Sequence, residues 1–240
     1  MRVALDSATE VGARTGRVLF AESSVTYLGL IQPPGQRTGT RSGPAGDLSN
    51  YDVIVSDGTT PANDLIARSS VYGIPLVLWS DEPGLHRGPA AAPVIAGANV
   101  GSTLAPALTH HPSAVVTESD TVTIAWTEPG TPRRKGTAVA FPDPVGVVWA
   151  TERSVGKFVA HRTDEWGGAV ITASGPQGDR VIGVADHAAH LEALTLAAVT
   201  LVAAESGYGA RIQDAAVRGE QVLAKAMDLE LDVAVWRSSA

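Results

Sequence analysis

The first part of the chain, to about residue 97, alternates short apolar runs with helical segments, and this alternation constrains the fold more than any other feature. Residues Arg2–Asp6, 25–31, 52–56 and 75–79 have the length and apolar content of strands, the last two being of the kind buried on both faces. Helices are expected over residues 10–22 and 61–72, the second closed by Gly73. Such a β-α-β series predicts a doubly wound parallel sheet whose ligands lie at the carboxyl ends of its strands.

Two stretches interrupt this pattern. Residues 32–50 are rich in proline and glycine, so they are expected to be irregular where a parallel crossover normally carries a helix. Residues 89–97 are rich in glycine, proline and alanine and are expected to form a connector. The sequence therefore predicts a Rossmann-like first domain over residues 1–97.

The second part of the chain has the two-residue periodicity of antiparallel strands. After a helix over residues 102–109, strands are expected over 121–126, 145–151, Lys157–Arg162, 169–174 and 181–186, with a hairpin turn at residues 175–179. A long helix over 187–205 follows, and its apolar side is expected to cover one face of the sheet that these strands form. This predicts an α+β domain over residues 98–205, built on an open, mainly antiparallel sheet. Residues 206–240 are expected to add a helix (214–227) and a strand (229–236) that pack back on the first domain.

Composition excludes several classes of site. The net charge of −7 argues against nucleic-acid binding, which needs a dense basic face, and the absence of cysteine removes disulfides and thiolate chemistry. Asp6 interrupts the N-terminal apolar run before a signal-peptide core can form, and the apolar stretch 191–204 is shorter than a membrane span. A cytoplasmic protein without membrane association is therefore expected.

Four segments resemble the dihydrodipicolinate reductases, which are nucleotide-dependent reductases of lysine biosynthesis. They match that family in order and spacing over residues 1 to about 205, and are residues 52–61 (DVIVSDGTTP), 73–78 (GIPLVL), 98–99 (AN) and 135–138 (KGTA). The resemblance implies an NAD(P)-dependent oxidoreductase with a homo-oligomeric assembly. The family's tetramer forms through the open face of the second sheet, where Val147, Trp149, Val159 and Ile171 are suitable contacts, so a homo-dimer or homo-tetramer is expected.

The resemblance places the cofactor at three turns. The cofactor-binding positions of the family correspond to three groups of residues in this chain. They are Ser7, Thr9, Glu10 and Gly12 after the predicted strand 2–6, Asp57, Gly58 and Thr59 after strand 52–56, and Trp79 and Asp81 after strand 75–79. Ser7 and Glu10 stand where the family has glycines that let the backbone approach a pyrophosphate. Glu10 favours a self-capped helix without phosphate, Trp79 is expected to fill the nicotinamide space, and Thr59 or Thr60 could instead begin the helix at Pro61. Weak or absent dinucleotide affinity is therefore expected.

The family's substrate-binding histidine pair and lysine are missing. Trp126, Thr127 and Gly130 stand at those positions. The surviving candidates are Asn99 and the loop Arg133, Arg134, Lys135, Gly136 and Thr137, whose cations and amides would bind a carboxylate or phosphate, unless the loop is only a solvated basic surface. His161 is a reserve catalytic acid; otherwise the catalytic residue is unknown.

Four other histidines have structural explanations. His110 and His111 end a helix, where cations favour the helix dipole, and His187 and His190 share a helix face with no obvious further ligand, so no metal is expected.

Two functions remain open. One is an NAD(P)-dependent reductase of a small carboxylated imine or enone. The alternative is a non-redox relative with a degenerate nucleotide site, acting as a small-anion-binding, structural or regulatory protein.

Overall fold

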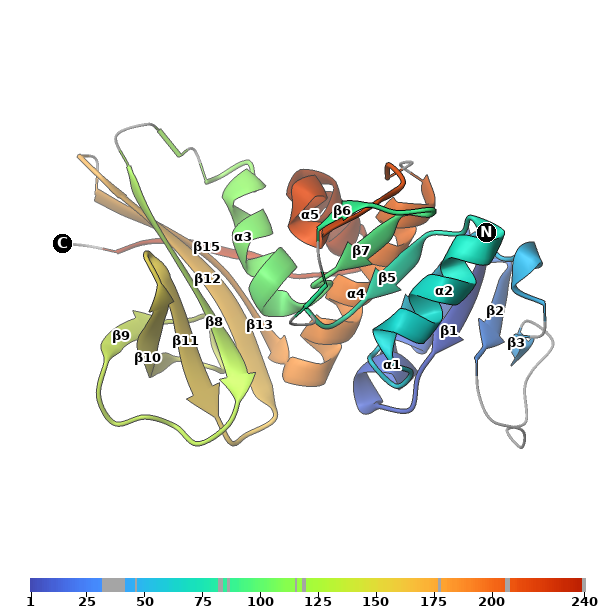
Figure 1. The fold of residues 1–240 in the computed structure, drawn as a ribbon. Coiled ribbons are helices and arrows are strands. Elements are labelled where there is room, and N and C mark those ends of the chain that lie inside the picture. The colour runs from blue at the N-terminus through green and yellow to red at the C-terminus, as the bar shows by residue number, and fades with distance from the viewer. Residues whose placement is uncertain are drawn as a thin grey trace. The chain divides into compact units, whose positions relative to one another are not determined.

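The computed structural model describes residues 1–31, 42–45, 47–81, 84–85, 87–114, 116–117, 120–176, 178–205 and 208–238. They form two compact units: residues 1–99 with 193–217, and residues 100–192 with 218–240. Each unit contains one sheet. The predicted class is confirmed: a doubly wound, mainly parallel sheet in the first unit and a mainly antiparallel sheet in the second (Figure 1).

The first sheet has the strand order β3-β2-β1-β4-β5-β7-β14-β6, in which only the β14–β6 pair is antiparallel. Short apolar runs form its central strands because burial on both faces suits β-branched and leucine side chains. The strands of this sheet are β1 (Arg2–Asp6), β2 (Tyr27–Leu30), β3 (Ser42–Pro44), β4 (Val53–Ser56), β5 (Leu76–Leu78), β6 (Gly88–Pro89), β7 (Val94–Ala96) and β14 (Arg211–Asp214).

Two helices lie on opposite faces of this sheet. Helix α2 (Ala62–Tyr72) packs with Ala4 in one core cluster, whereas α1 (Glu10–Ala21) lies beside Leu5, the next residue of β1. Successive strand residues point to opposite faces, so the two helices do too. The chain therefore reverses its winding between β1 and β4, and the carboxyl ends of these strands form the topological switch point where such sheets bind ligands.

Three expectations for this region were wrong in detail. Within residues 32–50, which were expected to be irregular, the described part contains β3 and a 3₁₀ turn, Leu48–Asn50. Pro44 is tolerated because β3 is an edge strand. The expected connector, residues 89–97, contains β7. The helix expected over 214–227 begins later, at Gly219, because β14 ends at Asp214 and a 3₁₀ turn (Ala215–Arg218) precedes α5 (Gly219–Asp228). Short strands between glycines and prolines carry too little periodicity to be recognised locally.

The second sheet has the order β15-β13-β12-β8-β11-β10-β9, in which only the β11–β8 pair is parallel. The expected hairpin is confirmed by the antiparallel pairing of β12 with β13, which reaches Gly175 and Gly178. The tail contributes β15, which pairs with β13. The strands are β8 (Thr121–Pro129), β9 (Thr137–Ala140), β10 (Val147–Ser154), β11 (Lys157–Arg162), β12 (Trp166–Gly175), β13 (Gly178–His187) and β15 (Ala234–Ser238).

A helical segment packs on this sheet. It consists of a π-helical turn (Val100–Leu104), α3 (Ala105–Ala107) and a 3₁₀ turn (Leu108–His110), and it contacts β8, β12 and α5. Trp126 lies against Gly101, where an added Cβ would be 2.4 Å from the indole nitrogen. The expectation that the helix 187–205 covers this sheet was wrong, because its residues 193–205 belong to the first unit. The helix observed there, α4 (Ala188–Glu205), is apolar on all sides, so it has no single apolar face that would be directed toward a sheet.

The long helix α4 (Ala188–Glu205) is buried on every side over residues 193–203 rather than on the one expected face. A helix that is apolar all round belongs in a protein core or a membrane. Among the described residues α4 is the helix long and apolar enough to cross a membrane, but 67% of it is buried inside the protein. Burial inside the protein therefore also accounts for the apolar composition of α4.

Candidate functional site

The turn after β1 is held by hydrogen bonds within the chain. Thr9 is the N-cap of α1, and its Oγ1 accepts a hydrogen bond from the Gly12 amide at 3.3 Å. The Ala8 amide donates to Thr59 Oγ1 at 2.7 Å, and the Thr9 amide donates to Asp57 Oδ2 at 3.0 Å. Three of the turn's amides are thus bonded to the chain itself, which shapes the turn without any ligand.

Asp57, at the carboxyl end of β4, is the centre of this arrangement. Its carboxylate accepts hydrogen bonds from the hydroxyls of Thr9 (2.7 Å) and Thr59 (2.5 Å), besides the Thr9 amide. Burial acts to raise the pKa of Asp57, but the hydrogen bonds from Thr59, Thr9 and Ser7 outweigh it, so the pKa lies below its usual value. Asp57 therefore places a negative charge beside the turn at neutral pH.

A second buried carboxylate ties the same two loops together. Asp6, only 1% exposed, accepts hydrogen bonds from Ser56 Oγ at 2.6 Å, from the Thr60 amide at 3.0 Å and from Thr60 Oγ1 at 2.7 Å. Thr60 and Thr59 thus bind carboxylates rather than capping α2, whose N-cap is Pro61 without a side-chain cap. The sequence signal for Asp6 was an acid that ends an apolar strand at the sheet's ligand-binding edge.

Gly12 allows the turn to close this tightly. An added Cβ at Gly12 would lie 2.0 Å from Ser7 Oγ and 2.3 Å from Asp57 Oδ2, distances that no real Cβ adopts. Close contact between the first strand and the first helix is what the last glycine of a dinucleotide-binding turn provides. Gly12 retains that role even though the chain lacks the preceding glycines.

Two amides of the first turn of α1 stay open. The N–H groups of Glu10 and Val11 form no hydrogen bond to any described residue. The Glu10 carboxylate bonds instead to Arg14, one turn along the helix, with Oε1 2.8 Å from Nη2. Open amides at a helix N-terminus attract anions, since they combine free donors with the positive end of the helix dipole.

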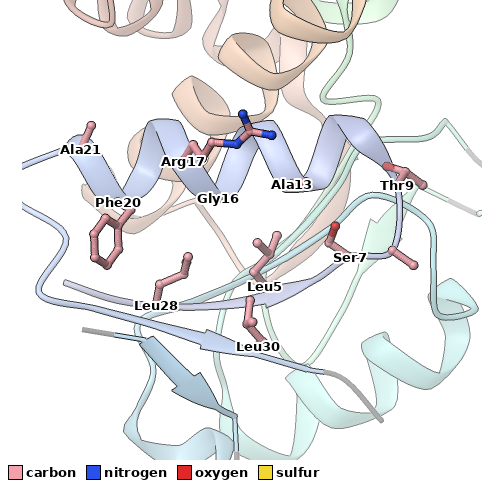
Figure 2. A pocket seen from close by; sticks show the side chains of 11 residues that line it. Leu5, Ser7, Thr9, Ala13, Gly16, Arg17, Phe20, Ala21, Leu28 and Leu30 are labelled. Carbon is pink, nitrogen blue, oxygen red and sulfur yellow. The ribbon is translucent and has the colours of Figure 1, made fainter. Parts of the chain in front are cut away.

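A pocket of about 560 Å³ opens beside this turn (Figure 2). Ser7, Ala8 and Thr9 line one end, and the remaining walls are mostly apolar and come from α1, β1 and β2. Leu5, Leu28 and Leu30 form the strand side, and Arg17 and Phe20 lie on the helix side. An apolar pocket with a few polar groups at one end is the usual form of a small-molecule site, and its volume lies in the usual range of about 300–1,000 Å³.

The residues after β5 are fastened to other parts of the first unit. Trp79 is partly exposed, its amide donates to Ser56 O at 3.0 Å, and Asn99 Nδ2 donates to its carbonyl at 2.9 Å. Asp81 pairs with Arg87, which also pairs with Asp214 of β14. Glu82 and Pro83 of this expected cofactor turn lie outside the described residues. Asp81 is therefore engaged in an ion-pair network that joins β14 to the turn.

In the second unit, the residues aligned with the family's histidine pair have structural roles. Trp126 is 6% exposed and its Nε1 donates to Glu128 Oε1 at 3.0 Å. Thr127 Oγ1 accepts a hydrogen bond from the Gly168 amide at 2.9 Å. Gly136 brings β9 against β10, since an added Cβ would lie 2.2 Å from the Ala150 carbonyl oxygen. The Gly-Thr pair thus supports strand pairing.

The basic loop divides into residues with different surroundings. Arg133, Arg134 and Lys135 are all exposed, but only Arg133 lines a pocket of about 270 Å³. His161, the reserve acid, lines the same pocket, as does Trp149. The structure thus places Arg133 and His161, which the sequence suggested for different reasons, in one pocket. Trp149, which the sequence suggested only as an oligomer contact, lines the same pocket.

Two other histidines, His187 and His190, lie near acids. His187 Nε2 lies 3.4 Å from Glu165 Oε1, and His190 Nε2 lies 3.7 Å from Asp186 Oδ2. Within the described ranges no group of three or more histidine, aspartate and glutamate side chains is arranged to hold a metal ion.

Comparison of the sequence with models of known protein families and with curated protein sequences gives no match. Solved structures do share the fold. Dihydrodipicolinate reductase from Paenisporosarcina sp. TG-14, bound to dipicolinate, is 10% identical, with 89% of this chain and 97% of that chain covered and a TM-score of 0.55.

Two dehydrogenases align over similar lengths. DAP dehydrogenase of C. glutamicum in complex with DAP is 12% identical, with 90% and 93% of the two chains covered and a TM-score of 0.53. An engineered D-amino acid dehydrogenase is 9% identical, with the same coverage and a TM-score of 0.52. The chain therefore has the two-part fold of these reductases and dehydrogenases over most of its length.

Proposed function

We propose that this protein is an NAD(P)-dependent oxidoreductase that binds its nucleotide at the carboxyl ends of β1 and β4. The observation that carries the proposal is the pair of open amides, Glu10 and Val11, at the switch point of a doubly wound sheet and beside an apolar pocket. Gly12, where a Cβ would collide with Ser7, fits a close approach of helix and strand at such a site.

The proposed substrate is a small carboxylated imine or enone. A bound nicotinamide would supply the hydride, and the chain's own residues would bind and orient the substrate and deliver a proton. Arg133, Arg134 and Lys135 offer exposed cations for a carboxylate, and His161 is the proposed proton donor. Solved structures of the same fold include a reductase bound to dipicolinate, a small dicarboxylate.

A second function has one specific observation in its favour. Asp57, whose pKa is lowered, holds a negative charge against the turn that would receive a pyrophosphate. This favours weak nucleotide binding, or a non-redox protein that binds a small anion. Asp57→Asn keeps the shape of the side chain and removes the charge, so it should raise nucleotide affinity several-fold if repulsion is the dominant effect.

The decisive experiment uses two substitutions of Glu10, the first residue of α1. Glu10→Pro and Glu10→Ala both remove the ion pair with Arg14, but only proline also removes the open amide. Proline is well accepted at this position, and Thr9 before it already has the extended conformation (φ −99°, ψ 168°) that a residue preceding proline requires. The two variants should therefore fold alike.

Calorimetric titrations with NADPH and NADH should show saturable binding to the parent and to Glu10→Ala. Glu10→Pro should bind at least about fivefold more weakly, because a hydrogen bond to a charged group is lost. Equal affinities of the proline and alanine variants would show that the Glu10 amide does not bind the nucleotide, which would contradict the proposal. An absence of binding by the parent at millimolar nucleotide would favour the non-redox function.

A further inference from the structure

The pocket in the second unit combines three different chemical groups in a small space. The strand register that pairs Ala150 with Ala160 places Trp149 of β10 opposite His161 of β11, on the same face of the sheet. Val147 lies two residues from Trp149 and thus on that face too. Arg133, in the loop before β9, completes the group. The pocket is thus built by residues from two paired strands and two loops, the second of which follows β11.

His161 presents one defined nitrogen to the pocket. Its Nδ1 is buried without a hydrogen-bond partner among the described residues, whereas Nε2 is not buried and has no protein partner there either. Gly130 lies against the ring, since an added Cβ would be 3.3 Å from His161 Cδ2. The ring is therefore held in place with Nε2 as the atom that a ligand can reach.

Arg133 is the cation available to a ligand. The neighbouring Arg162 donates to Asp164 and, at 2.7 Å, to the Val145 carbonyl oxygen. The hydrogen bond from Arg162 is the main cause that lowers the pKa of Asp164, so these two opposite charges offset each other within the pocket wall. Arg133 is exposed and has no hydrogen bond or ion pair among the described residues. Its charge leaves the pocket with an unbalanced cation.

Trp149 and Val147 belong to the apolar part of the lining. Trp149 is 49% exposed and Val147 is 72% exposed, so two neighbouring apolar side chains form an exposed patch on one face of β10. A partly exposed indole can stack with a planar, conjugated group. The volume of about 270 Å³ lies just below the roughly 300–1,000 Å³ of sites for drug-sized ligands, so the pocket suits one ring with its substituents.

We propose that this pocket binds a small planar carboxylate. The carboxylate lies between the Arg133 guanidinium and His161 Nε2, and the conjugated part of the ligand stacks on Trp149. This deepens the proposed function in two ways. It assigns the substrate's acid group to Arg133 rather than to the whole basic loop, and it makes His161 a ligand of that acid group in place of the proton donor. Only the description of the ligand as a substrate rests on the proposed function; the binding itself does not.

The test uses three probes without any nucleotide, so a failure of nucleotide binding cannot affect it. Benzoate is planar and charged, benzamide is planar and neutral, and cyclohexanecarboxylate is charged but not planar. Binding is followed by the NMR signal of the Trp149 indole N–H, assigned with Trp149→Phe. Benzoate should shift this signal saturably and bind more tightly than either of the other probes.

Two adjacent arginines supply the matched variants. Arg133→Ala should weaken benzoate by about tenfold, as expected for the loss of a charge-assisted hydrogen bond, while Arg134→Ala, outside the pocket, should leave it unchanged. His161→Gln keeps a donor and should have a smaller effect than His161→Phe. Equal weakening by both arginine variants, equal binding of benzamide, or an indole signal that never moves would each overturn the proposal.

Discussion

At the scale of single residues, the carboxylate that is hydrogen-bonded to the turn after β1 belongs to Asp57 rather than to Glu10. The sequence pointed to Glu10 because it occupies the position of a phosphate-binding glycine. The structure pairs Glu10 with Arg14 and brings Asp57, 48 residues away from Thr9, to the turn. A side chain that arrives from another strand has no signal in the local sequence of the turn that it joins.

The lowered pKa of Asp57 predicts a pH-dependent contribution to stability. The ionised carboxylate stabilises the fold above its unfolded-state pKa of about 3.9, and this contribution is lost as the pH falls through the lower pKa of the folded state. Asp57→Asn should therefore reduce the free energy of unfolding at pH 7 by about 1.5–3 kcal/mol, the effect of one hydrogen bond to a charged group.

Urea denaturation between pH 7 and pH 3 measures the difference in the free energy of unfolding between the parent and Asp57→Asn. This difference should become smaller as the pH approaches 3. Asp232→Asn is the control, since Asp232 is exposed and has no hydrogen bond within the described part of the chain. A gap between Asp57→Asn and the parent that stays constant over the whole pH range would contradict the assignment of the stabilising charge.

At the scale of elements, the C-terminal end of α2 depends on a left-handed residue. Gly73 has φ +67° and ψ 23°, and no heavy atom lies within 4 Å of an added Cβ. Gly73→Ala should thus lower stability only through its backbone conformation, by about 1–2 kcal/mol, and Gly73→Asn by less, because asparagine tolerates this conformation better. Thermal denaturation of both variants tests the prediction, and an equal loss from the two would argue against it.

The pairing of β9 with β10 depends on Gly136 for a different reason. Gly136 has φ +147°, and an added Cβ would collide with the Ala150 carbonyl oxygen. Gly136→Ala should lower the melting temperature, because backbone strain alone would destabilise the fold by roughly 1–3 kcal/mol and the collision would add to this loss. The same substitution should speed hydrogen exchange of the β9 amides. Gly178→Ala has a similarly positive φ (+89°) and open space around it, so it should leave exchange in β9 unchanged. Unchanged β9 exchange in Gly136→Ala would refute this role.

At the scale of the whole molecule, a homo-dimer or homo-tetramer stays a prediction. The registers place the four suggested contact residues on one face of the second sheet, but Val159 (5% exposed) and Ile171 (1% exposed) are buried within the chain. Only Val147 and Trp149 are exposed and available to a partner. Light scattering at micromolar concentration should give at least twice the monomer mass, and Val147→Lys should lower it. A monomeric parent protein would exclude the assembly.

The sequence by itself determined most of the elements and the class of fold. Apolar runs, two-residue alternation and turn residues such as Gly73 depend on neighbours along the chain, so they were sufficient to locate β1, β4, α2 and the β12–β13 hairpin. The doubly wound order followed from the alternation of strands and helices, since parallel strands require crossovers.

Only the tertiary structure decided which groups meet. It assigned β14 to the first sheet and β15 to the second, it bonded Asp57 to the turn after β1, and it brought Arg133 and His161 into one pocket. Each of these contacts joins residues far apart in the sequence, and its energy depends on burial and on hydrogen-bond geometry that arise only when the strands pair. Local periodicity specifies which side of an element is buried, but not which distant residue it is buried against.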